Sequence, residues 1–299
     1  MPDFDLSVTI CSWNTCEDLR ACLQSLREVR DEANFETLVV DNASADGSAM
    51  MVAIEFPEVR LLAQTTNLGF TGGHNLALKE RRGHHGMLLN SDTIVHQGAL
   101  RALVHFLEAN PKAGVVGPKL LNPDGSLQFS CRTFPNPVAA AFRNTFFGRL
   151  FPKNHYTRDY LMQDWDHASV RDVDWVSGAA LVARGELIDQ IGGLDPSFFM
   201  YCEDVDYCKR AGAAGYRVVY VPDGVITHAI GRSTDRAANR MIIRFHRSMF
   251  RYYVKHQLNE SPWLLRPGLY GFAALALGTR AGLFLAKNGW DAVGRMVKR

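Results

Sequence analysis

The chain has 299 residues, of which 47% are hydrophobic and 21% charged, so it can bury a substantial core in one large domain or in a domain with an appendage. It contains no low-complexity tract and no internal repeat of 20–50 residues, which argues against a disordered protein or a repeat protein. The net charge of +2 is unevenly divided: residues 232–299 hold 13 Lys and Arg against 3 Asp and Glu, whereas residues 1–231 hold 20 against 28.

The first residues, MPDFDLSVTICSW, lack a basic segment followed by a cleavable apolar stretch, so we expect no signal peptide. The six cysteines, at positions 11, 16, 22, 131, 202 and 208, form no C-x-x-C pair. This spacing argues against a zinc ribbon or a thioredoxin motif. We therefore expect reduced, mostly buried cysteines in a cytosolic protein.

Five apolar runs rich in β-forming residues follow one another at regular spacing. They begin near Leu6, Phe35, Arg60, Gly86 and Ala113, and helical patterns such as residues 17–29 and 98–110 separate them. Strands that alternate with helices at this spacing predict a parallel α/β sheet. Ligands bind such sheets outside the carboxyl ends of the strands, so the residues there are site candidates.

Polar residues follow each of the first four runs. They are Ser12 and Asn14, then Asp41, then the loop TTNLGFTGGHN (65–75), then Asn90, Ser91 and Asp92. The turn after the first run reads CSWNTCED rather than G-x-G-x-x-G, and no G-x-x-x-x-G-K-[ST] occurs, so neither a dinucleotide fingerprint nor a P-loop is present.

The second half of the chain predicts a more varied set of elements. NPDGSL (122–127) predicts a hairpin turn, residues 150–172 an irregular surface loop, and DWVSGAALVARG (174–185) a strand that runs into a helix. VVYVPDGVITH predicts a late strand that ends at His228. Residues 235–256 form a helical pattern, and residues 268–287 are mostly apolar.

The stretch FFMYCEDVDYC places Glu203, Asp204 and Asp206 within four residues of one another. Acids at a helix N-terminus complement the helix dipole, which is the structural alternative to a catalytic role. Val205, Cys208 and Ala211 form an inward strip, so we expect Asp206 to face away from Asp204 and to pair with Arg210. Asp206 is therefore interpreted as structural.

Two other positions are candidates for a metal or phosphate site. Asp92 can supply a hard oxygen ligand to Mg²⁺ or Mn²⁺, and the alternative is that it caps the following turn. His228 can complete such a site as a neutral imidazole, although a single His at a strand end is more often structural. Arg232, in the sequence Gly-Arg-Ser, can approach a phosphate.

Several segments occur in a characteristic order along the chain: VTICSWN, DNAS, NLGFTGGHN, LLNSD, WVSGAALVARG, GGLDPSFFMYCEDVDYCKRAGAAGY and His228-x-x-Gly-x-Ser. Together they resemble the inverting family 2 glycosyltransferases with the GT-A fold, and most of all their rhamnosyltransferase-like branch. The resemblance covers roughly residues 5–255. It implies a Rossmann-like, mostly parallel central sheet flanked by helices, with a helical extension that is basic and apolar. The implied domains are a catalytic domain at 1–234, with a nucleotide-binding half to about residue 120 and an acceptor half from about 121, and an extension at 235–299.

The resemblance also implies roles for individual residues. Asp41 corresponds to the acid that contacts the nucleotide base, Asp92 to the metal-binding acid of the D-x-D motif and His228 to a further metal ligand, whereas Asn90 departs from that motif. Asp204 corresponds to the general base, with Glu203 beside it in the acceptor site. The remaining implied donor contacts are Ser12, Asn14, Asn67, Gly69, Gly73, Asn75, Asn90, Ser91 and Arg232, and the implied acceptor contacts are Trp175, Gly178 and Ala179.

The implied reaction is metal-dependent and inverting. One carboxylate is sufficient as the base, and Mg²⁺ or Mn²⁺ offsets the charge of the departing diphosphate. A glycoside hydrolase needs two carboxylates on opposite sides of the bond, and the adjacent Glu203 and Asp204 are poorly placed for that.

The basic tail predicts an anionic partner. Basic residues at 236, 240, 244, 247, 251 and 255 form one stripe on a helix, and the alternative is a solvated face. The apolar segment after it is marginal for a membrane span, so we expect an interfacial helix on anionic lipid at the inner face of the membrane.

The expected function is the transfer of L-rhamnose from dTDP-rhamnose to a lipid-linked or polysaccharide acceptor in cell-surface glycan synthesis. UDP-hexosamine, UDP-galactose and UDP-galactofuranose stay open as donors, because no short motif specifies the sugar. An alternative from another class is a nonenzymatic protein that binds glycan or nucleic acid through the basic stripe. No nucleic-acid partner is expected for the enzyme, and an oligomer is compatible with the sequence.

Overall fold

The computed structural model describes residues 3–135, 150–151, 154–229 and 238–297. The strands are β1 (Phe4–Ser12), β2 (Phe35–Asp41), β3 (Arg60–Ala63), β4 (Gly83–Asn90), β5 (Thr93–Val95), β6 (Ala113–Leu121), β7 (Leu127–Gln128), β8 (Cys131–Arg132), β9 (Arg171–Asp172), β10 (Trp175–Val176), β11 (Ala180–Ala183) and β12 (Arg217–His228). The helices are α1 (Cys16–Glu28), η1 (Arg30–Glu32), α2 (Ser48–Glu55), α3 (Gly69–Lys79), α4 (Ala99–Ala109), α7 (His155–Tyr160), α8 (Gly185–Ile191), α9 (Glu203–Ala213), α10 (Ala238–Tyr252), the π-helical η3 (Tyr253–Leu258) and α11 (Arg266–Val297).

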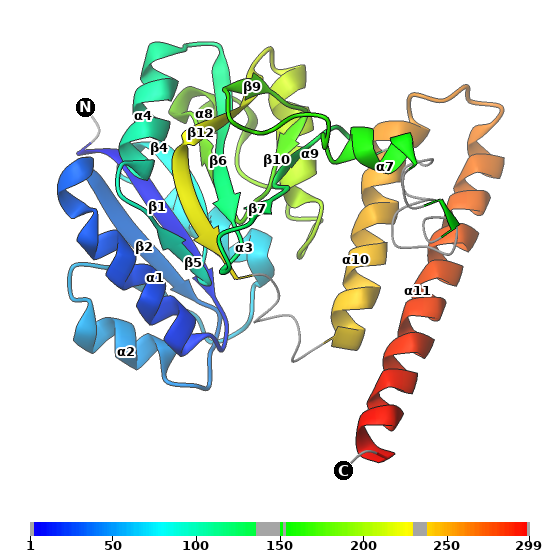
Figure 1. Ribbon diagram of the computed structural model, residues 1–299, viewed down its shortest axis with the longest axis horizontal. Helices are drawn as coiled ribbons and strands as arrows, with labels where there is room; N and C mark the ends of the chain where they lie inside the picture. Colours follow the sequence, from blue (N-terminus) through cyan, green and yellow to red (C-terminus); the bar gives the residue numbers. More distant parts are fainter. Residues whose placement is uncertain (1–2, 136–149, 152–153, 230–237, 298–299) are drawn as a thin grey trace.

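The central sheet has the strand order β3-β2-β1-β4-β11-β6-β12-β5. Strands β3, β2, β1 and β4 are parallel, as the sequence predicts, and β12 is parallel to β6. The short strand β11 lies antiparallel between β4 and β6, and β5 lies antiparallel at the edge beside β12. The carboxyl ends of β1, β2 and β4 therefore meet at one edge of the sheet (Figure 1).

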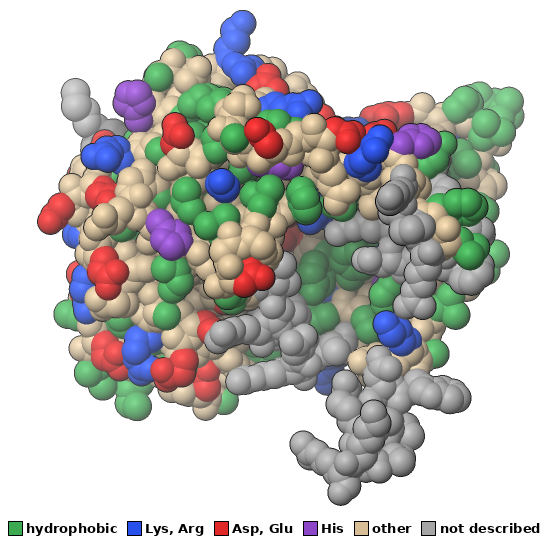
Figure 2. All heavy atoms as spheres, viewed as in Figure 1, with side chains coloured by type: hydrophobic (Ala, Val, Ile, Leu, Met, Phe, Trp, Pro, Cys, Tyr) green, Lys and Arg blue, Asp and Glu red, His purple; other side chains and the backbone are tan. Residues whose placement is uncertain are grey.

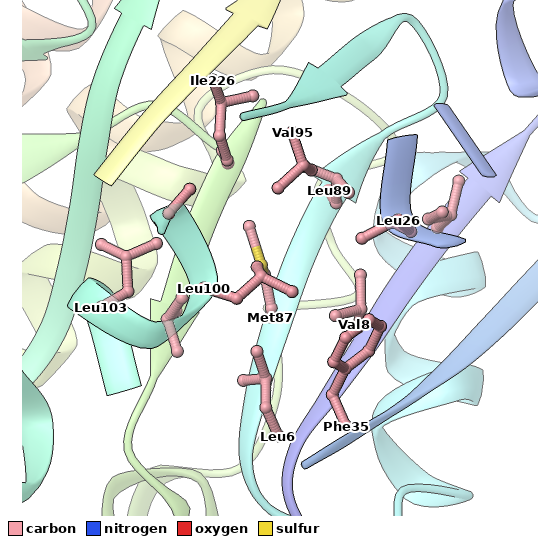
Figure 3. Packing of buried hydrophobic residues seen from close by; sticks show 14 of the residues in the cluster. Leu6, Val8, Leu26, Phe35, Met87, Leu89, Val95, Leu100, Leu103 and Ile226 are labelled. Carbon is pink, nitrogen blue, oxygen red and sulfur yellow. The ribbon is translucent and has the colours of Figure 1, made fainter. Parts of the chain in front are cut away.

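Helices cover both faces of this sheet, and the sheet separates two main cores. On one face, α1, α2 and α4 bury residues such as Leu23, Val52 and Leu103 against β1 and β4. Figure 3 shows Leu103 and Leu26 approaching the sheet from α4 and α1. On the other face α8 and α9 bury Leu187, Cys208 and their neighbours, and the predicted inward strip of Val205, Cys208 and Ala211 is confirmed.

Two sequence expectations need correction. The segment expected as a glycine-rich loop after the third strand is largely helix α3, which begins at Gly69. The glycines do not prevent the helix because they allow close packing: a side chain on Gly73 would collide with Cys11 Sγ. The segment expected to be irregular at 150–172 contains helix α7, whose Tyr160 is buried.

The C-terminal elements are α10, η3 and α11. In Figure 1, α10 and α11 stand side by side at one end of the molecule. Phe250 of α10 packs edge-on against Tyr270 of α11, with ring centroids 5.1 Å apart. The predicted hairpin at 122–127 is confirmed by the pairing of β6 with β7, and all six cysteines are free thiols.

Candidate functional site

A cleft opens at the edge of the sheet where β1, β2 and β4 end. Its lining comes from the turns after these strands, from the start of α3, from the segment before α9 and from α10. The lining residues are Cys11, Ser12, Trp13, Asn42, Asn67, Gly69, Phe70, Ser91, Phe199, Met200, Met241 and Arg244. Four of the implied donor contacts, Ser12, Asn67, Gly69 and Ser91, are therefore brought together.

A chain of hydroxyl groups joins the ends of β1 and β4. Ser12 Oγ lies 2.9 Å from Thr15 Oγ1, which lies 3.0 Å from Ser91 Oγ. All three side chains are buried, so these contacts satisfy hydroxyls that would otherwise be costly to bury. Thr15 was not among the implied contacts, because its place in this chain depends on Ser91, 76 positions away.

The end of β2 holds a buried acid. Asp41 is 3% exposed, and its Oδ2 accepts a hydrogen bond from the Ser44 N–H at 3.0 Å. Its Oδ1 has no hydrogen-bond partner among the residues that the structure describes, so it can accept a bond from a ligand. Asn14 connects this turn to β1, because its Oδ1 accepts from the Ala45 N–H at 2.8 Å.

The glycine turn before α3 forms one side of the cleft. Asn67 Oδ1 accepts from the Gly69 N–H at 2.8 Å, and Asn42 Nδ2 donates to the Gly69 carbonyl at 3.1 Å. Gly69 has φ +77°, a conformation that side-chain-bearing residues rarely adopt.

Asn75 serves the fold in this structure. Its Nδ2 donates to the Leu194 carbonyl at 2.7 Å, and its Oδ1 accepts from the Leu194 N–H at 2.8 Å. The side chain thus fixes the segment before α9 against α3, and its implied contact with the donor stays a prediction.

Asp92 and His228 come together at the ends of β4 and β12. Asp92 Oδ1 lies 3.4 Å from His228 Nε2, and both side chains are largely buried. Asn90 Nδ2 lies 3.1 Å from the same nitrogen, so Asn90 acts as a hydrogen-bond donor where the D-x-D motif has an acid.

Gln128 of β7 determines which nitrogen of His228 carries the proton. Gln128 Nε2 donates to Asn122 Oδ1 at 2.9 Å and to the His228 carbonyl at 3.2 Å, so its Oε1 faces His228 Nδ1 at 2.7 Å as an acceptor. This network assigns the proton to Nδ1, so the lone pair of Nε2 accepts the hydrogen bond from Asn90, and Asp92 Oδ1 lies 3.4 Å from the same nitrogen. A carboxylate and an imidazole oriented in this way fit a divalent cation.

A second group of possible metal ligands lies at the opposite end of β4. Ligand atoms of His84, His85 and Glu186 lie within 4.8 Å of one another. His85 Nε2 lies 2.8 Å from Glu108 Oε1, and its Nδ1 accepts from the Gly185 N–H at 3.2 Å, so both ring nitrogens already have partners. This arrangement favours a structural role for His85.

The acid cluster begins helix α9 after a strained turn. Tyr201 and Cys202 both have positive φ, 72° and 64°, which costs of order 1–3 kcal/mol each and is typical of functional sites. Asp204 Oδ2 accepts from the Gly178 N–H at 3.0 Å, and Oδ1 accepts from the Val205 N–H at 2.8 Å.

Glu203 differs from Asp204 in its hydrogen bonding. It is 5% exposed, and its Oε2 has no partner among the described residues. Burial, together with the charge of Asp204, raises the pKa of Glu203 well above its usual range. Burial also raises the pKa of Asp204, but the two backbone N–H groups oppose that shift. The hydrogen bonds to Asp204 therefore favour its ionised form, whereas Glu203 Oε2 has no corresponding donor among the described residues.

Of the three implied acceptor residues, Gly178 lies beside Asp204, whereas Ala179 and Trp175 are buried. A side chain at Gly178 would lie 3.4 Å from both Asp204 Cβ and Phe70 Cζ, so Gly178 lies between Asp204 and a residue that lines the cleft. Ala179 is buried, and its carbonyl accepts from the Asn90 N–H at 2.9 Å. Trp175 is 6% exposed and donates its indole N–H to the Thr133 carbonyl at 2.9 Å, which explains it as a core residue.

Asp206 faces away from Asp204, as expected. Its Oδ2 accepts from Arg210 Nε at 2.8 Å, and its Oδ1 lies 2.6 Å from Lys255 Nζ and 2.7 Å from His256 Nε2. Burial alone would raise the pKa of Asp206, but these partners outweigh it and the pKa is lowered. Lys255 and His256 belong to η3, so this network fastens the C-terminal elements to α9.

The expected basic stripe divides into two groups. Arg240, Arg247 and Arg251 are exposed on α10, whereas Arg244 contacts Phe199 and Lys255 contacts Asp206. Arg232 and Arg236 lie outside the described residues. Sequence reasoning missed Gln128 and the cleft-lining role of Arg244, because both depend on contacts between distant segments.

Comparison with protein families gives one match that spans most of the chain. Residues 2–247 match a family model described as glycosyltransferase like family 2. The chain is also 32% identical, over 256 residues and 82% of each protein, to an N-acetylglucosaminyl-diphospho-decaprenol L-rhamnosyltransferase of Mycobacterium tuberculosis. This match decides against the nonenzymatic alternative.

Solved structures share the fold. A mannosyltransferase, PcManGT from Pyrobaculum calidifontis in complex with GDP-Man and Mn²⁺, superposes with a TM-score of 0.58 at 20% identity, over 98% of this chain and 80% of that one. GalNAc-T7 with UDP, GalNAc and Mn²⁺ gives a TM-score of 0.55 at 13% identity, over 76% of this chain and 44% of that one. At such identities the likeness concerns the fold alone, which is GT-A.

Proposed function

The chain belongs to glycosyltransferase family 2 and is a glycosyltransferase of glycan synthesis, and from that premise we propose that it transfers L-rhamnose from dTDP-rhamnose to a lipid-diphosphate-linked glycan, with inversion. The choice of rhamnose as the donor sugar rests on one observation. The chain is 32% identical, across 82% of both chains, to an enzyme named for rhamnosyl transfer to a diphospho-decaprenol acceptor. The cleft and the Asp204 carboxylate support the chemistry.

The donor occupies the cleft at the carboxyl ends of β1, β2 and β4. Asp41 offers its unpartnered Oδ1 to an N–H of the pyrimidine base. Ser12, Asn67 and Ser91 offer neutral hydrogen-bonding groups along the cleft toward Asp92. Thymine and uracil present the same ring N–H, so Asp41 serves a dTDP and a UDP donor equally.

Asp204 acts as the general base in a single displacement. Its carboxylate takes the proton of the acceptor hydroxyl as that oxygen bonds to the anomeric carbon. The bond from the anomeric carbon to the phosphate oxygen breaks, and its electron pair leaves with the nucleoside diphosphate. The hydrogen bonds from Gly178 and Val205 favour the ionised form of the carboxylate and hold it in position.

Asp92 and His228 are the residues that would hold Mg²⁺ or Mn²⁺. His228 Nε2 lies 3.4 Å from the Asp92 carboxylate, and the contact of Gln128 with Nδ1 holds the ring in that orientation. A divalent cation held there would supply Lewis-acid stabilisation of the negative charge on the departing diphosphate. The Mn²⁺ in the similar PcManGT and GalNAc-T7 structures supports this proposal.

Helix α11 provides the contact with the membrane that holds the acceptor. Residues 266–288 are long and apolar enough, by length and composition, to cross a membrane, and 6% of the most apolar window is buried. Phe272, Leu275 and Leu283 are 71%, 71% and 67% exposed. Figure 2 shows hydrophobic side chains gathered at the outer edge of the α10–α11 pair. The exposed arginines of α10 suit anionic lipid, so the enzyme lies peripherally on the inner face of the membrane.

A panel of donors tests the proposal. The full-length enzyme is incubated with an N-acetylglucosaminyl-diphospho-polyprenol acceptor, Mn²⁺ or Mg²⁺, and one nucleotide sugar at a time, and release of nucleoside diphosphate is measured. The expected result is acceptor-dependent release from dTDP-rhamnose that exceeds release from UDP-N-acetylglucosamine, UDP-galactose and UDP-galactofuranose. Preferential turnover of one of the UDP-sugars would replace rhamnose with that sugar.

A further inference from the structure

Helix α10 forms a wall of the cleft as well as a part of the C-terminal extension. Met241, which is 8% exposed, lines the cleft. Ser248 Oγ donates to the Met200 carbonyl at 2.8 Å, and the Phe245 ring packs edge-on against Tyr201 at 5.4 Å. Positions 241, 245 and 248 share one face of the helix, so α10 is fixed along several turns to the segment before α9.

Arg244 lies on the edge of this inward face. Its guanidinium carbon is 3.9 Å from the centroid of the Phe199 ring. Phe199 is itself placed by the glycine turn: a side chain at Gly69 would meet its ring atoms at 2.7 Å, and its carbonyl accepts from the Phe70 N–H at 3.0 Å. Arg244 is therefore held against the turn that begins α3.

The charge balance of the cleft indicates what Arg244 binds. Among the twelve described lining residues, Arg244 is the only charged one. No described carboxylate lies within ion-pair distance of its guanidinium, whereas Arg210 and Lys255 are both paired with Asp206. A half-buried cation that faces a cleft of hydroxyls and amides provides a site for an anion.

We propose that Arg244 binds the diphosphate of the nucleotide-sugar donor, and this inference rests on the proposed function. A guanidinium presents several N–H donors in a plane, which suits two phosphate oxygens at once. Because Phe199 holds it in place before the donor arrives, it can stabilise the charge of the leaving group without reorganisation. Under this assignment the donor site is incomplete without α10, so the catalytic unit extends beyond residue 234.

Calorimetric titration of the full-length protein with dTDP, UDP, thymidine and uridine, in the presence of Mg²⁺, tests the assignment. For Arg244→Gln we expect the affinity for the preferred nucleoside diphosphate to fall about 10- to 100-fold, as for the loss of a hydrogen bond to a charged group. Binding of the matching nucleoside should not change. Arg244→Lys should lie between Gln and the native residue, and the matched control Arg247→Gln, on the exposed side of α10, should bind normally.

Three results would overturn the assignment. If wild-type protein binds a nucleoside diphosphate and Arg244→Gln binds it equally well, Arg244 is no ligand and the proposed function stands. If the variant loses nucleoside and nucleoside diphosphate to the same extent, Arg244 only supports the cleft wall. If Arg244→Gln binds nucleoside diphosphates normally but is retained less by vesicles that contain a prenyl diphosphate, Arg244 binds the diphosphate of the acceptor. Failure of the wild type to bind either nucleoside diphosphate would contradict the proposed function itself.

Discussion

The backbone N–H of Gly178 donates a hydrogen bond to Asp204 Oδ2 at 3.0 Å. This contact joins the segment between β10 and β11 to the first turn of α9, and Val205 donates a second bond to the same carboxylate. Glu203 Oε2, one residue earlier, has no such partner among the described residues. Two adjacent buried acids therefore differ in the hydrogen bonds that stabilise their ionised forms.

Glu203→Gln tests this difference. Burial and the charge of Asp204 raise the pKa of Glu203 and so favour its protonated form, and the neutral amide of Gln should preserve the charge of the pair. We expect a loss well below the roughly 10²-fold that a general base supplies. Burial raises the pKa of Asp204, so kcat/KM should rise with pH through a value above that of an ordinary aspartate, and Glu203→Gln should leave this acidic limb in place. A large shift of the limb in the variant would mean that Glu203 is ionised.

Gln128→Leu tests the orientation of His228. Loss of the acceptor at Nδ1 frees the imidazole to change tautomer or turn, so we expect the Mn²⁺ concentration for half-maximal activity to rise about 10- to 100-fold. Gln128→Glu keeps an acceptor oxygen and should restore much of the affinity. Gln24→Leu, on the surface of α1, is the control. An unchanged Mn²⁺ dependence in Gln128→Leu would contradict the proposed metal site.

Asp206→Asn tests the attachment of η3 to α9. The variant leaves Arg210, Lys255 and His256 without their shared carboxylate, so we expect the free energy of unfolding in urea to fall by about 3 kcal/mol. The lowered pKa of Asp206 means that its contribution is present above the ordinary aspartate pKa of about 3.9 and is lost as pH falls through the lowered value. The stability difference should therefore shrink in acid.

The control for this measurement is Asp189→Asn, because Asp189 is 72% exposed and pairs with Arg81 at the surface. Its stability should stay close to that of the wild type. Equal stability of Asp206→Asn and wild type at pH 7 would show that the network does not hold η3.

Three exposed apolar residues of α11 test the membrane contact. The combined variant Phe272→Ser, Leu275→Ser, Leu283→Ser should lose about 100-fold in affinity for vesicles of phosphatidylglycerol and phosphatidylcholine in sedimentation, because it removes apolar surface that the lipid would cover. Ile54→Ser on α2 replaces an equally exposed apolar residue, 71%, and should bind normally. Unchanged sedimentation of the combined variant, or of protein lacking residues 260–299, would contradict the proposal.

The parallel half of the sheet was predictable because apolar runs and helical patterns alternate regularly along the chain. Strand β11 was recognised as a strand, but its antiparallel position between β4 and β6 depends on pairing across the fold. Helix α3 was missed because glycine disfavours helix in isolation, whereas here Gly69 makes room for Phe199 and Gly73 for Cys11.

The site residues also divide into those that the sequence identifies and those that only the folded chain reveals. Asp41, Asp92, Asp204 and His228 were identifiable because each lies at or just after the end of a strand or in the first turn of a helix, and resemblance supplied their roles. Gln128 and Arg244 were not assigned, because a glutamine after a turn and an arginine in a basic stripe have no local pattern that distinguishes them. Their contacts, with His228 100 residues away and with Phe199, exist only in the folded chain.

The most direct measurement is donor-dependent release of nucleoside diphosphate by Asp204→Asn, combined with the thermal shift that dTDP and Mn²⁺ produce. We expect transfer to fall by at least roughly 10²-fold while the thermal shift stays that of the wild type. Asp92→Asn, in contrast, should reduce the thermal shift. Normal turnover by Asp204→Asn would contradict its assignment as the base, and with it the mechanism proposed for this enzyme.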